Sequence, residues 1–492
     1  MTSIAKLEPV IGLEVHVQLL TNSKMFCSCK AAYTGAEPNT HVCPVCLGMP
    51  GTLPVINKKA IELTVMTALA LNCTIATDSK FDRKNYPYPD LMKGYQISQF
   101  DLPITNKGWL NIEPDNTDTR KIGITRVHLE EDTARLIHRI DVTGDTYSLV
   151  DINRSGVPLM EIVGEPDLKS AEEARLYLTK LHTILQYLGV STGNMDEGSF
   201  RCDANISLRK KGDPLPNWKV EVKNMNSFRA VFRALEFEID RQTNLFSKQQ
   251  PITQETRGWS EELGETVSQR TKEYAHDYRY FPEPDLPPLF VEKKWVNSIE
   301  STLPELPDAR KDRFMNEYML PAYEASLLTS SIGMANYFEQ ALDGVDTLVS
   351  DRPKTTANWI IGDLTHLLND SGSNIEDSPI KPAYLRELLD LMDAGKISVR
   401  MAKEIFEEMY IDSKQPSLII EAKGLSQIND EEKLQSIVAD IIASNSKAVE
   451  DYKKGKSNAV GFLVGQLMKE TKGQANPKTA NQLVKSALDA IK

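Results

Sequence analysis

Residues 123–167 read GITRVHLEEDTARLIHRIDVTGDTYSLVDINRSGVPLMEIVGEPD, and the pattern within this stretch decides the fold class. In its segment TRVHLE, residues 125–130, apolar and ionisable residues alternate. Successive side chains of a β-strand point to opposite faces of a sheet, so a strand here would place Arg126, His128 and Glu130 together. The pattern predicts a strand with one apolar face and one face of ionisable groups.

Three other segments show the same alternation. A solvated face is the ordinary meaning of such a pattern in any one strand, because half-buried antiparallel strands show it routinely. Four such strands favour another interpretation: an antiparallel sheet packed on helices, whose second face gathers groups suited to metal and phosphate chemistry. The segments are 10–20 with Glu14, His16 and Gln18 on one face, 201–208 with Arg201, Asp203, Asn205 and Ser207, and 219–223 with Lys219, Glu221 and Lys223.

Length and composition indicate a globular protein of several domains. A chain of 492 residues exceeds what one hydrophobic core usually supports, so two or three domains are expected. The N-terminus MTSIAKLEPV lacks the apolar core of a signal peptide, and no apolar run approaches a membrane span, so we expect a cytoplasmic protein without membrane contact. The net charge of -12 argues against non-specific coating of nucleic acid but leaves room for a local basic patch.

The order of patterns along the chain predicts an α+β domain followed by helical ones. Strand and helix patterns interleave in the first part without the regular alternation of βαβ units. The proline-dense segment RYFPEPDLPP, residues 279–288, cannot form a helix or a central strand and lies near the end of this part. The expected domains are residues 1–295, 296–412 and 413–492, with helices in the first at 58–71, 170–188 and 227–244.

Four of the six cysteines form a compact set: Cys27, Cys29, Cys43 and Cys46. Two close pairs joined by a loop suit a tetrahedral zinc ion, because each pair supplies two thiolates. In a reducing compartment such a set binds metal more often than it forms disulfides. The spacing predicts a structural zinc site, since thiolates would fill all four positions.

The ionisable strands also supply candidate Mg²⁺ ligands, because Mg²⁺ prefers carboxylate oxygens together with substrate phosphates. The candidates are Glu14, His16, Glu130, Glu131, Glu161 and Asp203. For His16 alone the alternative is a strand histidine with ordinary partners, and for residues 130–132 it is a solvated acidic turn. The segment FDRKNYPYPD, residues 81–90, presents Arg83 and Lys84 either as phosphate contacts or within an irregular structural loop.

Lysines outnumber nearby acids in the last domain. Contact with the phosphate backbone of RNA is one interpretation, and a solvated helix face is the other. The candidate RNA contacts are Lys453, Lys454, Lys472, Gly473 and Lys478.

Taken together, these motifs resemble the B subunit of the tRNA-dependent amidotransferase family, whose complexes make Gln-tRNA(Gln) or Asn-tRNA(Asn) from misacylated Glu-tRNA(Gln) or Asp-tRNA(Asn). The resemblance covers essentially the whole chain. It is carried by the two cysteine pairs and by GLEVHVQL (12–19), FDRKNYPYPDLMKGYQISQ (81–99), HLEEDTARLIH (128–138), LVDINRSGVPLMEIV (149–163), EGSFRCDANISL (197–208), EVKNMNSF (221–228), QETRGW (254–259), DYRYFPEPDLPPL (277–289) and VGQLMKETKGQANP (464–477).

The resemblance implies a fold and a site. The first domain would resemble glutamine synthetase, with a mainly antiparallel sheet and helices, followed by an all-α domain and an α-helical tail similar to the YqeY family. Its site would use ATP and Mg²⁺ to phosphorylate the side-chain carboxylate of the tRNA-linked amino acid, and zinc would be structural. The implied metal ligands are Glu14, His16, Glu130 and Glu161, with Glu131 a further catalytic candidate, and the implied phosphate or nucleotide contacts are Arg83, Arg201, Asp203 and Lys223.

The resemblance also implies partners. As a carbon–nitrogen ligase with glutamine as nitrogen donor, the chain would act in a heterotrimer with an amidase partner (the A subunit), which releases ammonia, and a small third partner (the C subunit). Its own sequence has no Gly/Ser-rich amidase signature with a paired lysine, which agrees with a separate ammonia source. The competing hypotheses are a non-catalytic zinc-containing tRNA-binding scaffold and a stand-alone ligase acting on a free amino acid, although a free amino acid needs no distant basic lobe.

Overall fold

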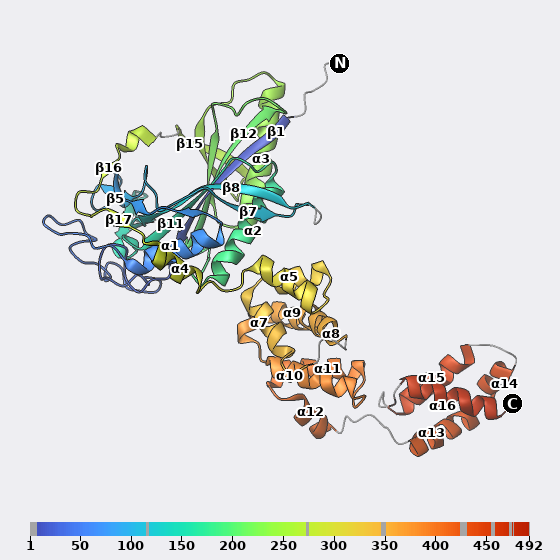
Figure 1. Cartoon of the computed structure of the whole chain (residues 1–492). Helices are drawn as coiled ribbons and strands as arrows, with labels where there is room; N and C mark the ends of the chain where they lie inside the picture. Colours follow the sequence, from blue (N-terminus) through green and yellow to red (C-terminus); the bar gives the residue numbers. More distant parts are fainter. Residues whose placement is uncertain are drawn as a thin grey trace. The chain divides into compact units, whose positions relative to one another are not determined.

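The alternating strands lie side by side in one large sheet (Figure 1). The computed structural model describes residues 7–114, 118–271, 275–345, 351–423, 431–453, 458–471, 475 and 477–491. The chain divides into two units, Met1–Pro307 and Asp308–Lys492. None of the helices in these described ranges is both long and apolar enough to cross a bilayer.

The sheet has eight strands in the order β15-β14-β13-β12-β1-β11-β8-β7. All neighbours are antiparallel except β13 and β14, which are parallel. The first strand of the chain is therefore central, between two strands that come much later in the sequence. The bounds are β1 (Leu7–Gln18), β7 (Gly108–Ile112), β8 (Arg120–Glu131), β11 (Pro158–Gly164), β12 (Phe200–Lys210), β13 (Val220–Met225), β14 (Glu255–Ser260) and β15 (Glu265–Thr271).

The apolar face of the sheet packs on helices, as the alternation predicts. Leu13, Val15 and Val17 of β1 are buried in one core with Leu178 and Leu181 of α2. Burying each such side chain contributes about 1.5–3 kcal/mol. The helices of this unit are α1 (Lys58–Ala70), α2 (Ala171–Tyr187), α3 (Phe228–Ser247) and α4 (Lys293–Glu300), with 3₁₀ turns η1 (Ile152–Arg154) and η2 (Ala275–Tyr278).

Serine caps set the starts of the two long helices. The Ser170 hydroxyl accepts a hydrogen bond from the Glu173 amide, and the Ser227 hydroxyl accepts one from the Ala230 amide. Each bond satisfies a backbone N–H that has no partner inside the helix. The predicted helices near 170–188 and 227–244 are thereby confirmed.

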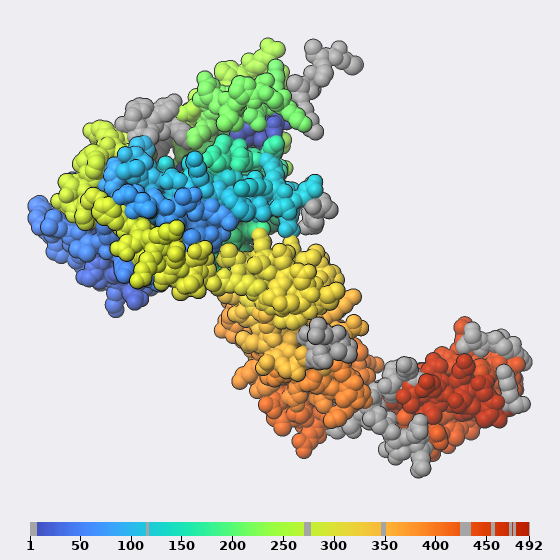
Figure 2. Space-filling model, in the orientation of Figure 1, coloured from blue at the N-terminus to red at the C-terminus, as the bar shows by residue number. Residues whose placement is uncertain are grey.

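Short strands surround one end of the sheet and join the two ends of the first unit. Strand β16 pairs with β4, and β17 pairs with β3, so the segment after residue 275 returns to residues 78–85. Figure 2 shows this yellow-green segment against the blue one at the surface. The short strands are β2 (Thr74–Ile75), β3 (Asp78–Ser79), β4 (Asp82–Asn85), β5 (Tyr95–Ser98), β6 (Thr105–Asn106), β9 (Arg135–Ile140), β10 (Thr146–Asp151), β16 (Phe281–Pro282) and β17 (Leu289–Phe290).

The first unit extends further along the chain than the boundary expected at residue 295. Helix α4 contacts α1, and its residues Trp295 and Val296 pack against the first core. The boundary expectation placed this helix in the next domain because the proline-dense segment before it looked like a linker. Strand β16 instead makes that segment an edge of the first unit.

The second unit is helical, as predicted, and contains two separate hydrophobic cores. The first includes Phe338, Leu388, Phe406 and Ile419, and the second includes Leu463. Its elements are α5 (Pro307–Glu317), α6 (Ala322–Leu328), α7 (Ile332–Ala341), α8 (Arg352–Asn358), the π-helical η3 (Trp359–Leu364), α9 (Thr365–Ser371), η4 (Ile375–Asp377), α10 (Pro382–Asp393), α11 (Val399–Asp412), α12 (Pro416–Lys423), α13 (Glu431–Ser444), α14 (Ser446–Lys453), α15 (Asn458–Glu470) and α16 (Pro477–Ala490). Because Ile419 lies in the first of these cores, α12 belongs with the helices before it rather than with a tail beginning at 413.

Candidate active site

Strand register brings the ionisable groups into rows across the polar face. His16 of β1 pairs with Glu161 of β11 and with Arg201 of β12, and Glu161 pairs in turn with His128 of β8. Directly paired residues of antiparallel strands share a face. Four ionisable side chains from four strands therefore line up in one row.

Three of the ionisable groups on this face converge closely enough to hold a metal ion. One ligand atom from each of His16, Glu130 and Glu161 lies within 4.8 Å of the others. The His16 Nε2 atom is 3.7 Å from Glu130 Oε1 and 3.5 Å from Glu161 Oε2. Glu130 is only 3% exposed and accepts a hydrogen bond from the Ser98 hydroxyl at 3.2 Å.

The electrostatics of this cluster favour ionised carboxylates. Burial alone would raise the pKa of the Glu161 carboxyl, but His128 and His16 hold it well below its usual range. Burial would lower the pKa of His16, and Glu161 and Glu130 raise it above its ordinary value. Two carboxylates and one imidazole form a donor set that fits a divalent cation such as Mg²⁺ or Mn²⁺.

A second polar group lies one step along β1. Glu14 faces Asp203 across the strand pair and accepts a hydrogen bond from the Asn205 amide at 2.8 Å. The Lys223 ammonium is 2.6 Å from an Asp203 oxygen and 3.7 Å from a Glu221 oxygen. The predicted residues Glu14, Asp203 and Lys223 thus lie together, beside the three-ligand cluster rather than within it.

Arg201 is held in place by a buried acid that the sequence analysis did not select. Asp132 accepts hydrogen bonds from the Arg201 guanidinium at 2.9 Å and from the Gln18 amide at 2.7 Å. Burial would raise the pKa of the Asp132 carboxyl, but Arg201 and Arg154 lower it. The guanidinium therefore sits in a fixed orientation at the end of the row.

The two cations of the segment at 81–90 have different surroundings. Arg83 makes two hydrogen bonds to the buried Glu283, at 2.7 and 2.8 Å, so its guanidinium is engaged in the fold. The neighbouring Lys84 points the other way along β4. Burial alone would lower the pKa of Lys84, but Glu130, Tyr280 and Glu161 raise it well above its usual range. Lys84 is the cation that faces the acid cluster, and strand alternation was the signal that separates it from Arg83.

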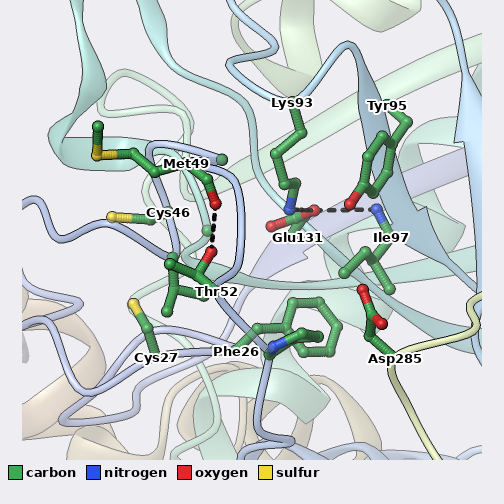
Figure 3. Close-up of a pocket in the computed structure, with 14 residues that line it drawn as sticks. Phe26, Cys27, Cys46, Met49, Thr52, Lys93, Tyr95, Ile97, Glu131 and Asp285 are labelled. Carbon is green, nitrogen blue, oxygen red and sulfur yellow. Dashed lines mark hydrogen bonds and ion pairs between the residues drawn. The ribbon is translucent and has the colours of Figure 1, made fainter.

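Glu131 lies on the opposite side of β8 from Glu130. Its carboxylate pairs with Lys93 and accepts the Ile97 amide at 2.9 Å. It lines a pocket whose other walls include Cys27, Cys46 and Asp285 (Figure 3). This placement separates Glu131 from the cluster to which the sequence analysis assigned it, because adjacent residues of a strand face opposite ways.

The four cysteines of the predicted zinc site are gathered in the loop between β1 and α1. The sulfur atoms of Cys27, Cys29, Cys43 and Cys46 all lie within 4.8 Å of one another, and all four are free thiols. A hydrogen bond with Cys27 and the nearby Lys24 ammonium lower the pKa of Cys46 to about 4. Lys24 is 1% exposed and also donates to the His41 carbonyl at 2.8 Å. Four convergent thiols beside a buried cation fit zinc tetrathiolate chemistry.

A second pocket of about 1190 Å³ opens on the polar face beside Glu14. Gly12 and Gly164 form part of its floor, where backbone replaces side chains. Leu215, Pro216 and Trp218 supply apolar walls, and Asn205, Ser207, Lys219 and Gln254 supply polar groups. An apolar cavity with a few polar groups is the usual form of a small-molecule site.

The predicted RNA contacts are only partly described. Lys453 is exposed at the end of α14, and Lys478 lies in the first turn of α16. Lys454, Lys472 and Gly473 lie outside the described residues.

Comparison with known proteins places these sites in a family context. Residues 9–297 match the family described as the GatB/GatE catalytic domain, and residues 336–488 match the GatB domain that carries the YqeY label. The chain is 57% identical to the B subunit of the aspartyl/glutamyl-tRNA(Asn/Gln) amidotransferase of Dehalococcoides mccartyi strain 195, over 98% of this chain and 99% of the relative. Proteins of the same name from Carboxydothermus hydrogenoformans and Thermomicrobium roseum are each 54% identical, over 98% of both chains.

Proposed function

Because this chain belongs to the family of amidotransferase B subunits, with its GatB/GatE catalytic domain, we propose that its polar sheet face phosphorylates the carboxylate of a misacylated tRNA. The substrates are the glutamyl group of Glu-tRNA(Gln), the aspartyl group of Asp-tRNA(Asn), or both. The observation that carries the proposal is the convergence of His16, Glu130 and Glu161 beside a cavity large enough for a nucleotide.

The reaction has two steps. A side-chain carboxylate oxygen attacks the γ-phosphorus of ATP, and the bond to the bridging oxygen breaks with release of ADP. Ammonia then attacks the acyl carbon, loses a proton, and expels inorganic phosphate to leave the amide. The first step depends mainly on positioning and on neutralising charge.

The residues of the row and its neighbours suit that task. His16, Glu130 and Glu161 would hold Mg²⁺, which when bound neutralises and orients phosphate oxygens. Lys84 remains protonated opposite the same acids and balances charge on the transferred group. Arg201, fixed by Asp132, offers guanidinium donors to phosphate or carboxylate oxygens at the end of the row.

We place the nucleoside of ATP in the cavity beside Glu14. The apolar wall with Trp218 suits a purine, and the two glycines let the ligand approach the backbone. Glu14, Asp203 and Lys223 lie between this cavity and the three-ligand cluster, where the phosphates would pass. Lys223 then supplies positive charge to the phosphates.

Ammonia would come from a separate amidase, the A subunit of the complex, and a small C subunit would complete a heterotrimer, as the name of the relatives implies for a B subunit. The tail would hold the tRNA. The competing function, a zinc-containing scaffold without chemistry, makes a different prediction for the acids of the row and is an outcome of the following experiment.

The experiment measures phosphate release from labelled ATP by the complex reconstituted with its amidase partner and misacylated tRNA. In the Glu130→Gln variant the rate at saturating ATP should fall by about 10²–10³-fold, because one charged ligand is lost from a preorganised site. In Trp218→Ala the KM for ATP should rise roughly tenfold, consistent with loss of about 1–3 kcal/mol of stacking, with kcat little changed.

The matched control is Glu172→Gln, which makes the same chemical change at a half-exposed acid of α2, paired with its helix neighbour Arg175. It should retain the wild-type rate. Undiminished phosphate release in Glu130→Gln, from a complex that still assembles, would move the chemistry to a partner protein and leave this chain as a scaffold.

A further inference from the structure

His128 is buried on the catalytic face but does not belong to the three-ligand cluster. It is 2% exposed and lies directly opposite Glu161 in the register of β8 and β11. Its Nε2 atom is 3.2 Å from Glu161 Oε2, the oxygen that His16 also approaches, at 3.5 Å. One carboxylate oxygen thus lies between two histidines that the sequence makes look alike.

The hydrogen bonds distinguish the two histidines. The Arg126 Nε–H group donates to His128 Nδ1 at 3.4 Å. A guanidinium has no acceptor, so Nδ1 must be the unprotonated nitrogen, and the ring proton of neutral His128 is on Nε2. That proton points at Glu161. A nitrogen that carries a proton cannot bind a metal, so His128 donates to the carboxylate while His16 is the nitrogen ligand.

We propose that His128 is a positioning residue for the metal site, whose Nε2–H bond to Glu161, fixed by Arg126, orients that carboxylate toward the ion shared with His16 and Glu130. The inference rests on the proposed function and deepens it. Groups that hold metal ligands from behind set ligand orientation, and their loss typically weakens metal affinity 10–100-fold. Arg126, His128 and Glu161 therefore form a chain of donors and acceptors that starts outside the metal site and ends in it.

Two amide substitutions separate positioning from simple packing. The side chain of His128→Gln is long enough to carry an N–H donor to the place of Nε2, and can still donate to Glu161. The side chain of His128→Asn is one carbon–carbon bond shorter. It can accept from Arg126 but cannot reach Glu161. The two variants are similar in polarity, so a difference between them reports the bond to Glu161.

The readout is Mn²⁺ binding by the reconstituted complex, measured by electron paramagnetic resonance, together with the Mg²⁺ dependence of phosphate release. His128→Asn should raise the Mn²⁺ Kd and the half-saturating Mg²⁺ concentration by about 10–100-fold, with kcat at saturating Mg²⁺ nearly restored. His128→Gln should stay close to wild type in both measurements. Arg126→Met, a change at a partly exposed site, should weaken Mn²⁺ binding less than His128→Asn, because both ring tautomers become available.

Glu161→Gln separates failure of this inference from failure of the proposed function. If Glu161→Gln binds Mn²⁺ as wild type does, the metal site is misplaced and both proposals fall. If Glu161→Gln loses Mn²⁺ while His128→Asn and Arg126→Met retain it, only the positioning role of His128 is overturned. Equal weakening in His128→Gln and His128→Asn would also overturn it, since packing rather than the donated bond would then be responsible. Should His128→Asn fail to assemble, the Arg126→Met titration decides alone.

Discussion

At the scale of single residues, burial decides which polar groups serve structure. Asp132 is 2% exposed and takes hydrogen bonds from Gln18 and Arg201. A buried acid with these partners stabilises the fold only while it is ionised. Its role in holding Arg201 therefore depends on pH.

The lowered pKa of Asp132 gives the sign of that dependence. Its stabilising contribution is present above the pKa of an unfolded aspartate, about 3.9, and is lost as pH falls through the lower folded value. Asp132→Asn should destabilise the first unit by about 1–3 kcal/mol at pH 7 and flatten the acid side of its stability profile. Thermal unfolding of wild type and variant between pH 7 and pH 3 measures both effects. Parallel profiles for the two proteins would contradict this account.

Residue-scale reasoning from sequence could place more of the site than it did. Alternation along residues 125–130 already puts Glu131 opposite Glu130, and the same rule separates Lys84 from Arg83. Convergence of His16 with Glu130 and Glu161 could not be predicted from any one strand, because it depends on the pairing of β1, β8 and β11. The same holds for Asp132, whose partners Gln18 and Arg201 come from distant segments.

At the scale of elements, helices were more predictable than the sheet. A helix such as α2 is encoded locally by its cap and its apolar spacing. The order of strands is set by contacts between segments far apart in sequence, and the short strands β16 and β17 carry almost no local signal. The loop between β1 and α1 has little regular structure, and its cysteines take the place of a core.

We expect zinc to hold that loop together. Cys43→Ser should lose the metal and lower the thermal stability of the first unit, because a tetrathiolate site couples binding energy to local folding. Zinc content by mass spectrometry and thermal unfolding of the purified complex measure the two effects. Cys73→Ser changes a cysteine outside the cluster and should keep its zinc. Full zinc content in Cys43→Ser would show that this cysteine is not a ligand.

At the scale of the whole molecule, the separate core around Leu463 makes the tail a distinct element of tRNA binding in our proposal. Replacing Lys453, Lys454, Lys472 and Lys478 with Gln should raise the KM for tRNA and reduce the steepness of its salt dependence, because fewer phosphate contacts release fewer counterions. The kcat at saturating tRNA should change little, since the proposal assigns the reacting carboxylate to the sheet face of the first unit.

The control for the tail variant is Lys293→Gln with Lys294→Gln, two exposed lysines of α4 in the first unit. This pair should leave the salt dependence as in wild type. An unchanged slope in the tail variant would mean that its lysines are an ordinary solvated surface.

The central place of β1 has a consequence for how the chain is made. The ribosome synthesises β1 first, but its neighbours are β11 and β12, which end at Gly164 and Lys210. At about 5–20 residues per second, translation from Gln18 to Lys210 takes roughly 10–40 s. For that time both edges of an apolar strand lack their native partners, and unpaired edges invite association with other chains. The newborn chain is therefore most in need of a chaperone before β12 emerges, long before the helical domains exist.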